Sequence, residues 1–221
     1  MSNQDLINKT ISFVKKELEN AEGGHDWFHI ERVYKNALLI ADSEVCDISI
    51  VKLASLLHDI ADSKFHPDAS GGDETIGPRI AREFLISNAV EEATIQHVIN
   101  IIENISFKGG KTEKTFSSVE LDIVQDADRL DAMGAIGIAR TFNYGGFKNR
   151  ALYNPNIAPN LHMSKEEYKN SEAPTLNHFY EKLLLLKDKM NTETGRQIAK
   201  ERHQFMETFL SQFYAEWDGE K

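Results

Sequence analysis

Apolar residues recur three and four positions apart along most of the chain, which places them on one face of an α-helix. This pattern predicts an all-α fold, and no convincing series of alternating strands interrupts it. Asp47 is the predicted N-cap of a strongly apolar third helix, which we expect to be central and buried. The expected helices span about residues 4–20, 26–43, 48–58, 78–88, 91–105, 118–131, a stretch that ends near Tyr144, 175–190 and 192–216.

Turn-forming residues are concentrated between these runs. The segments 61–74 and 107–116 are polar and contain glycine, and 145–173 is the least regular part of the chain. Gly134 and Gly137 either interrupt the helix near them or allow it to pack tightly. Since no internal repeat, low-complexity tract or clear linker is present, we expect one compact domain over residues 1–221.

Composition and charge narrow the function classes. Hydrophobic residues make up 41% and charged residues 27% of the chain, as in ordinary soluble proteins. No apolar run approaches the roughly 20 residues that a membrane span needs, and the polar N-terminus lacks the apolar core of a secretory signal. With Cys46 as the single cysteine, these features predict a cytoplasmic protein without membrane association or an internal disulfide.

The formal net charge of −10 argues against binding of extended nucleic acid, which needs a basic surface. A small phosphorylated partner is compatible with this charge, because a metal ion and a few basic side chains can make one cleft positive. Near the C-terminus, aromatic residues recur every four positions, which favours core packing or a homodimer surface over a base-stacking platform. They are Phe205, Phe209, Phe213 and Trp217.

The string LLHDIAD ends the apolar third helix with an imidazole and a carboxylate, His58 and Asp59. Burying these groups is costly unless they have a partner. A divalent cation binds neutral imidazole together with ionised carboxylate, and its charge offsets the burial of the carboxylate. Further candidates are His25 and His29, four residues apart, and the acidic residues Asp126, Asp128 and Asp131 of QDADRLDAMG, of which Asp128 and Asp131 share a helix face. A histidine-based site and an acidic cluster therefore lie on separate predicted helices.

The order of His29, His58-Asp59 and Asp128 resembles the HD-domain phosphohydrolase superfamily, whose signature is H…HD…D on a helical bundle. The strings HDWFHIERV, LLHDIADSKF and DADRLDAMGAIGIAR are similar to those of small bacterial HD nucleotide pyrophosphohydrolases. The resemblance implies an HD-domain helical bundle with additional C-terminal helices. Its metal-site core would cover about residues 25–150, and a helical extension about 151–221.

By this resemblance, a divalent metal ion is bound by His29, His58, Asp59 and Asp128. Mn²⁺ and Mg²⁺ are the preferred candidates, and other transition metals remain open. Such an ion polarises a phosphoryl oxygen and lowers the pKa of a bound water. Two histidines and two aspartates leave open positions on an octahedral ion for water and substrate.

Residues outside this set are candidates for supporting roles. An acidic residue near the position of Asp62 assists catalysis in related enzymes, so Asp62 is a candidate general base and Lys64 a candidate phosphate contact. A surface ion pair would explain these two residues nearly as well. His97 fits a core or cleft-wall role better than a second metal site, since no partner string supports a second ion. His25 and Asp26 are candidates for orienting ligands. The loop cations considered as phosphate contacts are Lys108, Lys111, Lys148 and Arg150.

Together these features predict a metal-dependent hydrolase of a small phosphorylated compound. A nucleoside triphosphate is the preferred substrate, with a nucleoside monophosphate and pyrophosphate as products. A nucleotidase or phosphodiesterase on the same site is a close alternative. A di-iron oxygenase would need additional ligands, for which His97 is the obvious spare residue. A non-catalytic nucleotide-binding module is a third alternative, which retention of all four candidate ligands disfavours.

Overall fold

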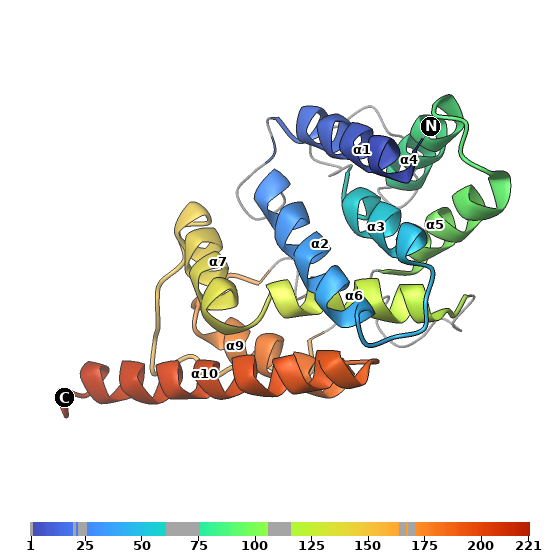
Figure 1. The fold of residues 1–221 in the computed structure, drawn as a ribbon. Helices are drawn as coiled ribbons and strands as arrows, with labels where there is room; N and C mark the ends of the chain where they lie inside the picture. The colour runs from blue at the N-terminus through green and yellow to red at the C-terminus, as the bar shows by residue number, and fades with distance from the viewer. Residues whose placement is uncertain are drawn as a thin grey trace. The chain divides into compact units, whose positions relative to one another are not determined.

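The structure, a computed structural model, describes residues 2–19, 21, 26–60, 76–105, 116–163, 167 and 171–221. Within these residues every regular element is a helix, which confirms the predicted all-α fold (Figure 1). The chain divides into two compact units, Met1–Asp128 and Arg129–Lys221. None of the helices in the described residues has the length and hydropathy to cross a membrane.

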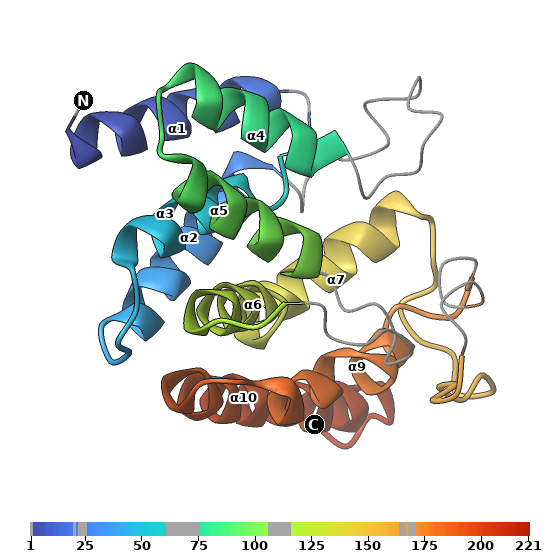
Figure 2. The same ribbon diagram turned by 90° about the vertical axis from the view of Figure 1, so that its right-hand side faces the viewer.

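Helix α3 is the centre of the first unit, as its apolar sequence predicts. Its side chains from Val51 to Leu57 are almost entirely buried, apart from Lys52. It packs against α1, α2 and α5, while α4 packs against α5 (Figure 2). The helices of this unit are α1 (Asn3–Glu17), α2 (Trp27–Ala41), α3 (Ile48–Leu57), α4 (Ile76–Ser87), α5 (Glu92–Ile105) and the greater part of α6 (Val119–Asp131).

The start of α3 is fixed by two carboxylates. The Asp47 side chain accepts hydrogen bonds from the backbone N–H groups of Ser49 at 2.8 Å and Ile50 at 3.4 Å, which confirms the predicted N-cap. The backbone N–H of Asp47 in turn donates to Glu120 Oε1 at 2.9 Å. Because Glu120 lies on α6, this bond ties the beginning of α3 to the beginning of α6.

The second unit is organised around α10, which packs against α7 and η3. An aromatic cluster forms part of its core, with Phe179 stacked on Phe209 at 5.8 Å between ring centroids and Phe142 packed against both. This supports the core-packing interpretation of Phe209. The elements are α7 (Gly134–Phe147), α9 (Asn177–Glu181), the 3₁₀-helix η3 (Leu183–Lys189) and α10 (Glu193–Trp217).

The prediction of one helix over residues 175–190 is wrong. The α-helix α9 covers only five residues, and the chain leaves helical geometry at Lys182, with φ −143° and ψ −57°. A 3₁₀-helix follows, in which Leu183 and Leu186 are buried. Residues three apart share a face at 3.0 residues per turn, so this geometry buries both leucines. The run of four leucines has no periodicity that could signal the change.

Gly134 and Gly137 mark a tight turn into α7. Gly134 has φ +67°, which side-chain-bearing residues rarely adopt, and it follows directly on the N-cap residue Met133. A Cβ atom at Gly137 would overlap the carbonyl oxygen of Ala132. The glycines therefore permit close packing within a continuous helix. That helix extends to Phe147, three residues beyond the predicted end at Tyr144.

Replacing Gly137 by alanine should destabilise the protein, because the new methyl group meets backbone that has no side-chain freedom to move away. We expect a loss of about 1–3 kcal/mol in the free energy of unfolding, measured by urea denaturation. Gly146→Ala is the matched control in the same helix, since a Cβ there meets nothing within 4 Å. The control should be neutral or slightly stabilising, as alanine is the better helix former. Equal losses in both variants would contradict the packing argument.

The buried side chain of His178 makes the stability of the folded protein depend on pH. Burial, followed by the nearby cations of Lys182 and Arg150, lowers the pKa of His178 to about 3. The unfolded chain binds a proton at this residue below about pH 6.5, whereas the folded protein stays neutral there. The contribution of His178 to the free energy of unfolding is therefore fully present above pH 6.5 and is lost progressively as the pH falls toward 3.

The expected slope is at most about 1.4 kcal/mol per pH unit in this window, and less because the residue is partly exposed. Urea denaturation of wild type and His178→Gln between pH 4.5 and 7.5 would measure it. The variant should have the shallower profile, since glutamine does not titrate. Parallel profiles would show that His178 is protonated as easily in the folded protein as in the unfolded chain.

Candidate metal centre

His29 enters the centre from the first turn of α2. The Asp26 side chain accepts a hydrogen bond from the backbone N–H of His29 at 3.0 Å and so caps this helix. Three residues into the helix, the imidazole of His29 is 3% exposed. The described structure thus gives Asp26 a role in starting the helix that carries His29. His25 lies outside the described residues.

His58 is the C-cap residue of α3, and its ring is fixed by the helix it ends. Its Nδ1 lies 2.9 Å from the carbonyl oxygen of Ser55. Since a carbonyl only accepts hydrogen bonds, Nδ1 carries the proton and Nε2 keeps its lone pair. Nε2 is buried and has no hydrogen-bond partner among the residues that the structure describes. A buried acceptor without a partner is costly, so this atom marks the place where a cation would fit.

Two carboxylates complete the cluster. Asp128 Oδ1 lies 3.6 Å from His29 Nε2 and 3.9 Å from His58 Nε2, and Asp59 Oδ2 lies 4.0 Å from His29 Nε2. Ligand atoms of His29, His58 and Asp59 all lie within 4.8 Å of one another. Ligands about 2.1 Å from one ion are separated by about 3.0 Å at right angles and about 4.2 Å when opposite. The three pair distances of 3.6, 3.9 and 4.0 Å fall within this range.

Burial divides the cluster into a closed and an open side. The imidazoles of His29 and His58 are 3% and 4% exposed, whereas the carboxylates of Asp59 and Asp128 are 30% and 41% exposed. Burial lowers the pKa of His58 more than the adjacent Asp128 raises it. His58 is therefore neutral at physiological pH, which is the form that binds metal ions. The imidazole nitrogens of His29 and His58, with two carboxylates, are a donor set suited to a divalent transition metal or Mg²⁺.

A contact between α2 and α6 holds Asp128 in place. Asn36 lies two turns after His29 on α2, and its Nδ2 donates to the carbonyl oxygen of Ala127 at 3.3 Å. This bond fixes the α6 backbone one residue before Asp128. Sequence reasoning does not select Asn36, because a polar residue on a helix is usually solvated. Its position on the same face as His29 is the signal that a search for ligand-supporting residues could have used.

Known proteins are similar in sequence to this chain over nearly its whole length. Residues 27–133 match the HD domain. The chain is 39% identical to YpgQ of Bacillus subtilis over 204 residues, which cover 91% of this chain and 88% of YpgQ. The chain belongs to the HD-domain superfamily. This confirms the resemblance inferred from the H…HD…D order, because the matched region contains all four candidate ligands.

Solved structures of related proteins are similar to this structure along nearly the whole chain. An HD-superfamily hydrolase from Bacillus thuringiensis aligns with a TM-score of 0.77 and 44% identity, covering 98% of this chain and 99% of that one. The crystal structure of Bacillus subtilis YpgQ in complex with ADP aligns with a TM-score of 0.74 and 32% identity, covering 98% and 97%. HD domains bind divalent metals, and the His/Asp cluster is the candidate site for one here.

The structure describes only some of the residues predicted to assist catalysis or to contact phosphate. Asp62 and Lys64 lie outside the described residues, as do Lys108 and Lys111. Their assignments stay predictions. Lys148 lies over the rings of Phe147 and Tyr144, at 5.2 and 5.7 Å, and Arg150 donates to the carbonyl oxygen of Ser171 at 2.5 Å. These contacts give both cations a structural role within the Arg129–Lys221 unit.

Asp131 of the acidic string and His97 of α5 form contacts outside the candidate metal cluster. Asp131 is 1% exposed and forms an ion pair with Arg140 at 2.6 Å, so it does not join Asp128 in the cluster although the two are three residues apart. His97 Nε2 lies 3.0 Å from Ser118 Oγ and 3.4 Å from Glu120 Oε2. This supports the cleft-wall or core role over a second metal site.

The geometry predicts that divalent cations stabilise the folded protein. Addition of Mn²⁺ at about 100 times its dissociation constant contributes about 2.7 kcal/mol, which for a chain of this size raises the melting temperature by about 5–10 °C. Asp128→Asn removes a charged ligand without changing shape and should abolish most of the shift. Asp42→Asn, at the exposed C-cap of α2, is the control and should keep it. A thermal shift identical in both variants would contradict the assignment.

Proposed function

We propose that this HD-domain protein is a divalent-metal-dependent hydrolase of small phosphorylated compounds, with nucleoside triphosphates as its substrate class. The observation that carries the proposal is the buried Nε2 of His58, which has no hydrogen-bond partner in the described part of the chain and lies within 4 Å of the half-exposed carboxylate of Asp128. Such an arrangement is unfavourable for folding alone and favourable for holding a cation. The preferred metals are Mn²⁺ and Mg²⁺.

The chain's own residues would divide the work. His29 and His58 would hold the ion from the buried side, while Asp59 and Asp128 would hold it at the solvent-exposed side, where a substrate can approach. The bound ion would supply a polarised phosphoryl oxygen and a water of lowered pKa. We assign Asp62 as a general base for the attacking water and Lys64 as a phosphate contact, on the strength of their positions shortly after Asp59.

The nucleotide assignment rests on similarity. YpgQ of Bacillus subtilis, which shares 39% of its residues with this chain over the aligned region, has been crystallised in complex with ADP. A diphosphate ligand in a relative supports a nucleotide as the substrate here. Cleavage between the α and β phosphorus atoms would then release pyrophosphate and a nucleoside monophosphate.

A release assay tests the proposal. We expect pyrophosphate from nucleoside triphosphates in the presence of Mn²⁺ or Mg²⁺, detected separately from inorganic phosphate. Asp59→Ala should lower kcat by more than about 100-fold, since loss of residues that only support metal ligands costs 10- to 100-fold. Asp42→Asn should retain wild-type activity. Full activity in Asp59→Ala would show that the cluster is not the catalytic centre.

The same assay separates the alternatives. Phosphate release from nucleoside monophosphates would favour a nucleotidase, and hydrolysis of diesters a phosphodiesterase. Nucleotide binding without turnover under any metal would favour a binding module. Two irons per chain with oxygen consumption would favour a di-iron oxygenase, although His97, its candidate extra ligand, contacts Ser118 and Glu120.

A further inference from the structure

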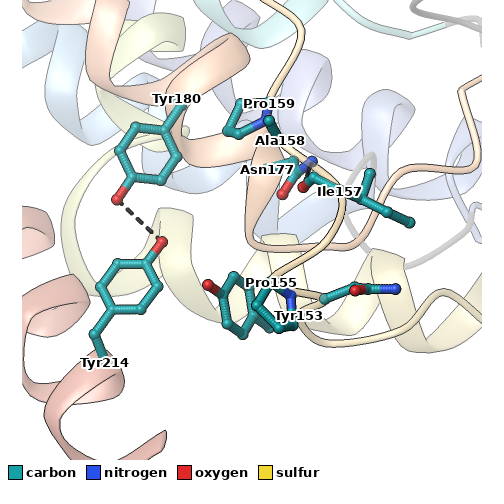
Figure 3. Close-up of a pocket in the computed structure, with 9 residues that line it drawn as sticks. Tyr153, Pro155, Ile157, Ala158, Pro159, Asn177, Tyr180 and Tyr214 are labelled. Atoms are coloured by element: carbon teal, nitrogen blue, oxygen red, sulfur yellow. Dashed lines mark hydrogen bonds between the residues drawn. The ribbon is translucent and has the colours of Figure 1, made fainter. Parts of the chain in front are cut away.

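A pocket of about 380 Å³ lies entirely within the Arg129–Lys221 unit (Figure 3). Its walls are the side chains of Tyr153, Tyr180, Tyr214, Asn154 and Asn177, with apolar residues of the segment 155–159. The volume falls in the range of small-molecule sites, which are about 300–1,000 Å³. None of the four predicted metal ligands contributes to it.

The walls are held by contacts within the unit. Asn177 Nδ2, at the start of α9, donates to the carbonyl oxygen of Ile157 at 3.1 Å. The ring of Tyr153 packs edge-on against Tyr214 and Trp217 of α10, at 5.4 and 4.9 Å between centroids. The segment 153–159 is thereby fixed to both helices. A ligand would meet a largely preformed surface and would lose little affinity to ordering of the protein.

Some hydrogen-bond donors and acceptors on the pocket walls are not used by contacts between the described residues. The hydroxyls of Tyr180 and Tyr214 lie 3.1 Å apart and face each other in Figure 3. Only one of the two hydrogens can lie between them, so the other is available to an acceptor. Asn177 is 2% exposed and uses its amide nitrogen, whereas its carbonyl oxygen accepts no hydrogen bond from the described residues. The pocket walls therefore offer a hydrogen-bond donor and an acceptor.

The pocket also lacks charge. No Lys, Arg, Asp, Glu or His is among the described residues that line it. Burial and the neighbouring Tyr180 raise the pKa of Tyr214 above its ordinary value, which keeps the phenol neutral at physiological pH. A phosphate or carboxylate would lose its hydration here without a compensating cation. Tyrosine rings, in contrast, favour a planar aromatic partner by stacking or edge-on contact.

We propose that this pocket binds a neutral, planar nitrogen heterocycle of the nucleobase or nucleoside class. The tyrosine rings would contact the ring system, while a Tyr180 or Tyr214 hydroxyl and the Asn177 carbonyl oxygen would pair with an acceptor and a donor on its edge. This site goes beyond the proposed hydrolysis, because its ligand carries no phosphate and uses no metal ligand.

Trp217 provides a direct probe, since it packs against Tyr153 and is 51% exposed. Trp27 is the other tryptophan of the chain, so a Trp27→Phe background leaves Trp217 as the single reporter. We expect titration with adenosine to change its emission saturably. In this background, Tyr180→Phe combined with Tyr214→Phe removes both hydroxyls and should raise the Kd about tenfold. Tyr144→Phe, outside the pocket, should leave the Kd unchanged.

Several results would overturn the proposal. These are no saturable change up to millimolar adenosine, or equal Kd values in the double variant and in Tyr144→Phe. The phenylalanine replacements keep the rings, and each single variant serves if the double variant does not fold. Loss of adenosine binding in Asp128→Asn would place the nucleoside at the metal centre and also refute the pocket. Pyrophosphate release tests the hydrolysis separately, so either proposal can fail alone.

Discussion

The hydrogen bond between His58 Nδ1 and the carbonyl oxygen of Ser55 is the contact on which the candidate centre depends. It uses a carbonyl group near the C-terminus of α3, where such groups lack partners within the helix. In doing so it fixes the tautomer of the imidazole and leaves the Nε2 lone pair facing Asp128. One contact thus satisfies a helix end and orients a metal ligand.

That orientation is useful only if the other ligands lie at the same point, and helix packing ensures this. Helix α3 is buried against α2, which carries His29. Glu120 ties the start of α6 to the start of α3, and Asn36 ties α2 to the α6 backbone beside Asp128. Polar contacts therefore join α6 to both α3 and α2, while α2 and α3 pack directly against each other. Small errors of helix placement, which would separate ligands by an ångström, are restricted in each pair.

The sequence predicts this part of the molecule well because its signals are local. The apolar run from Val51 to Leu57 and the Asp47 cap specify α3, and the His-Asp pair at its end is costly without a ligand. Sequence reasoning fails where packing between distant residues decides the helix type or the partner of a charged side chain. The run Leu183–Leu186 looks α-helical, yet it forms a 3₁₀-helix that buries Leu183 and Leu186 on one face. Asp131 looks like a partner of Asp128, yet it pairs with Arg140.

The unequal burial of the four side chains bears on how an acidic protein could bind the phosphorylated substrate that we propose. The cluster carries the carboxylates of Asp59 and Asp128 on its exposed side, within a chain of net charge −10. These charges would repel a phosphate as long as no cation is present. A divalent ion held by these residues would offset both carboxylates, and substrate would reach it from the exposed side because the imidazoles are buried. On the proposed function, affinity for an anionic substrate would then depend on prior binding of the ion.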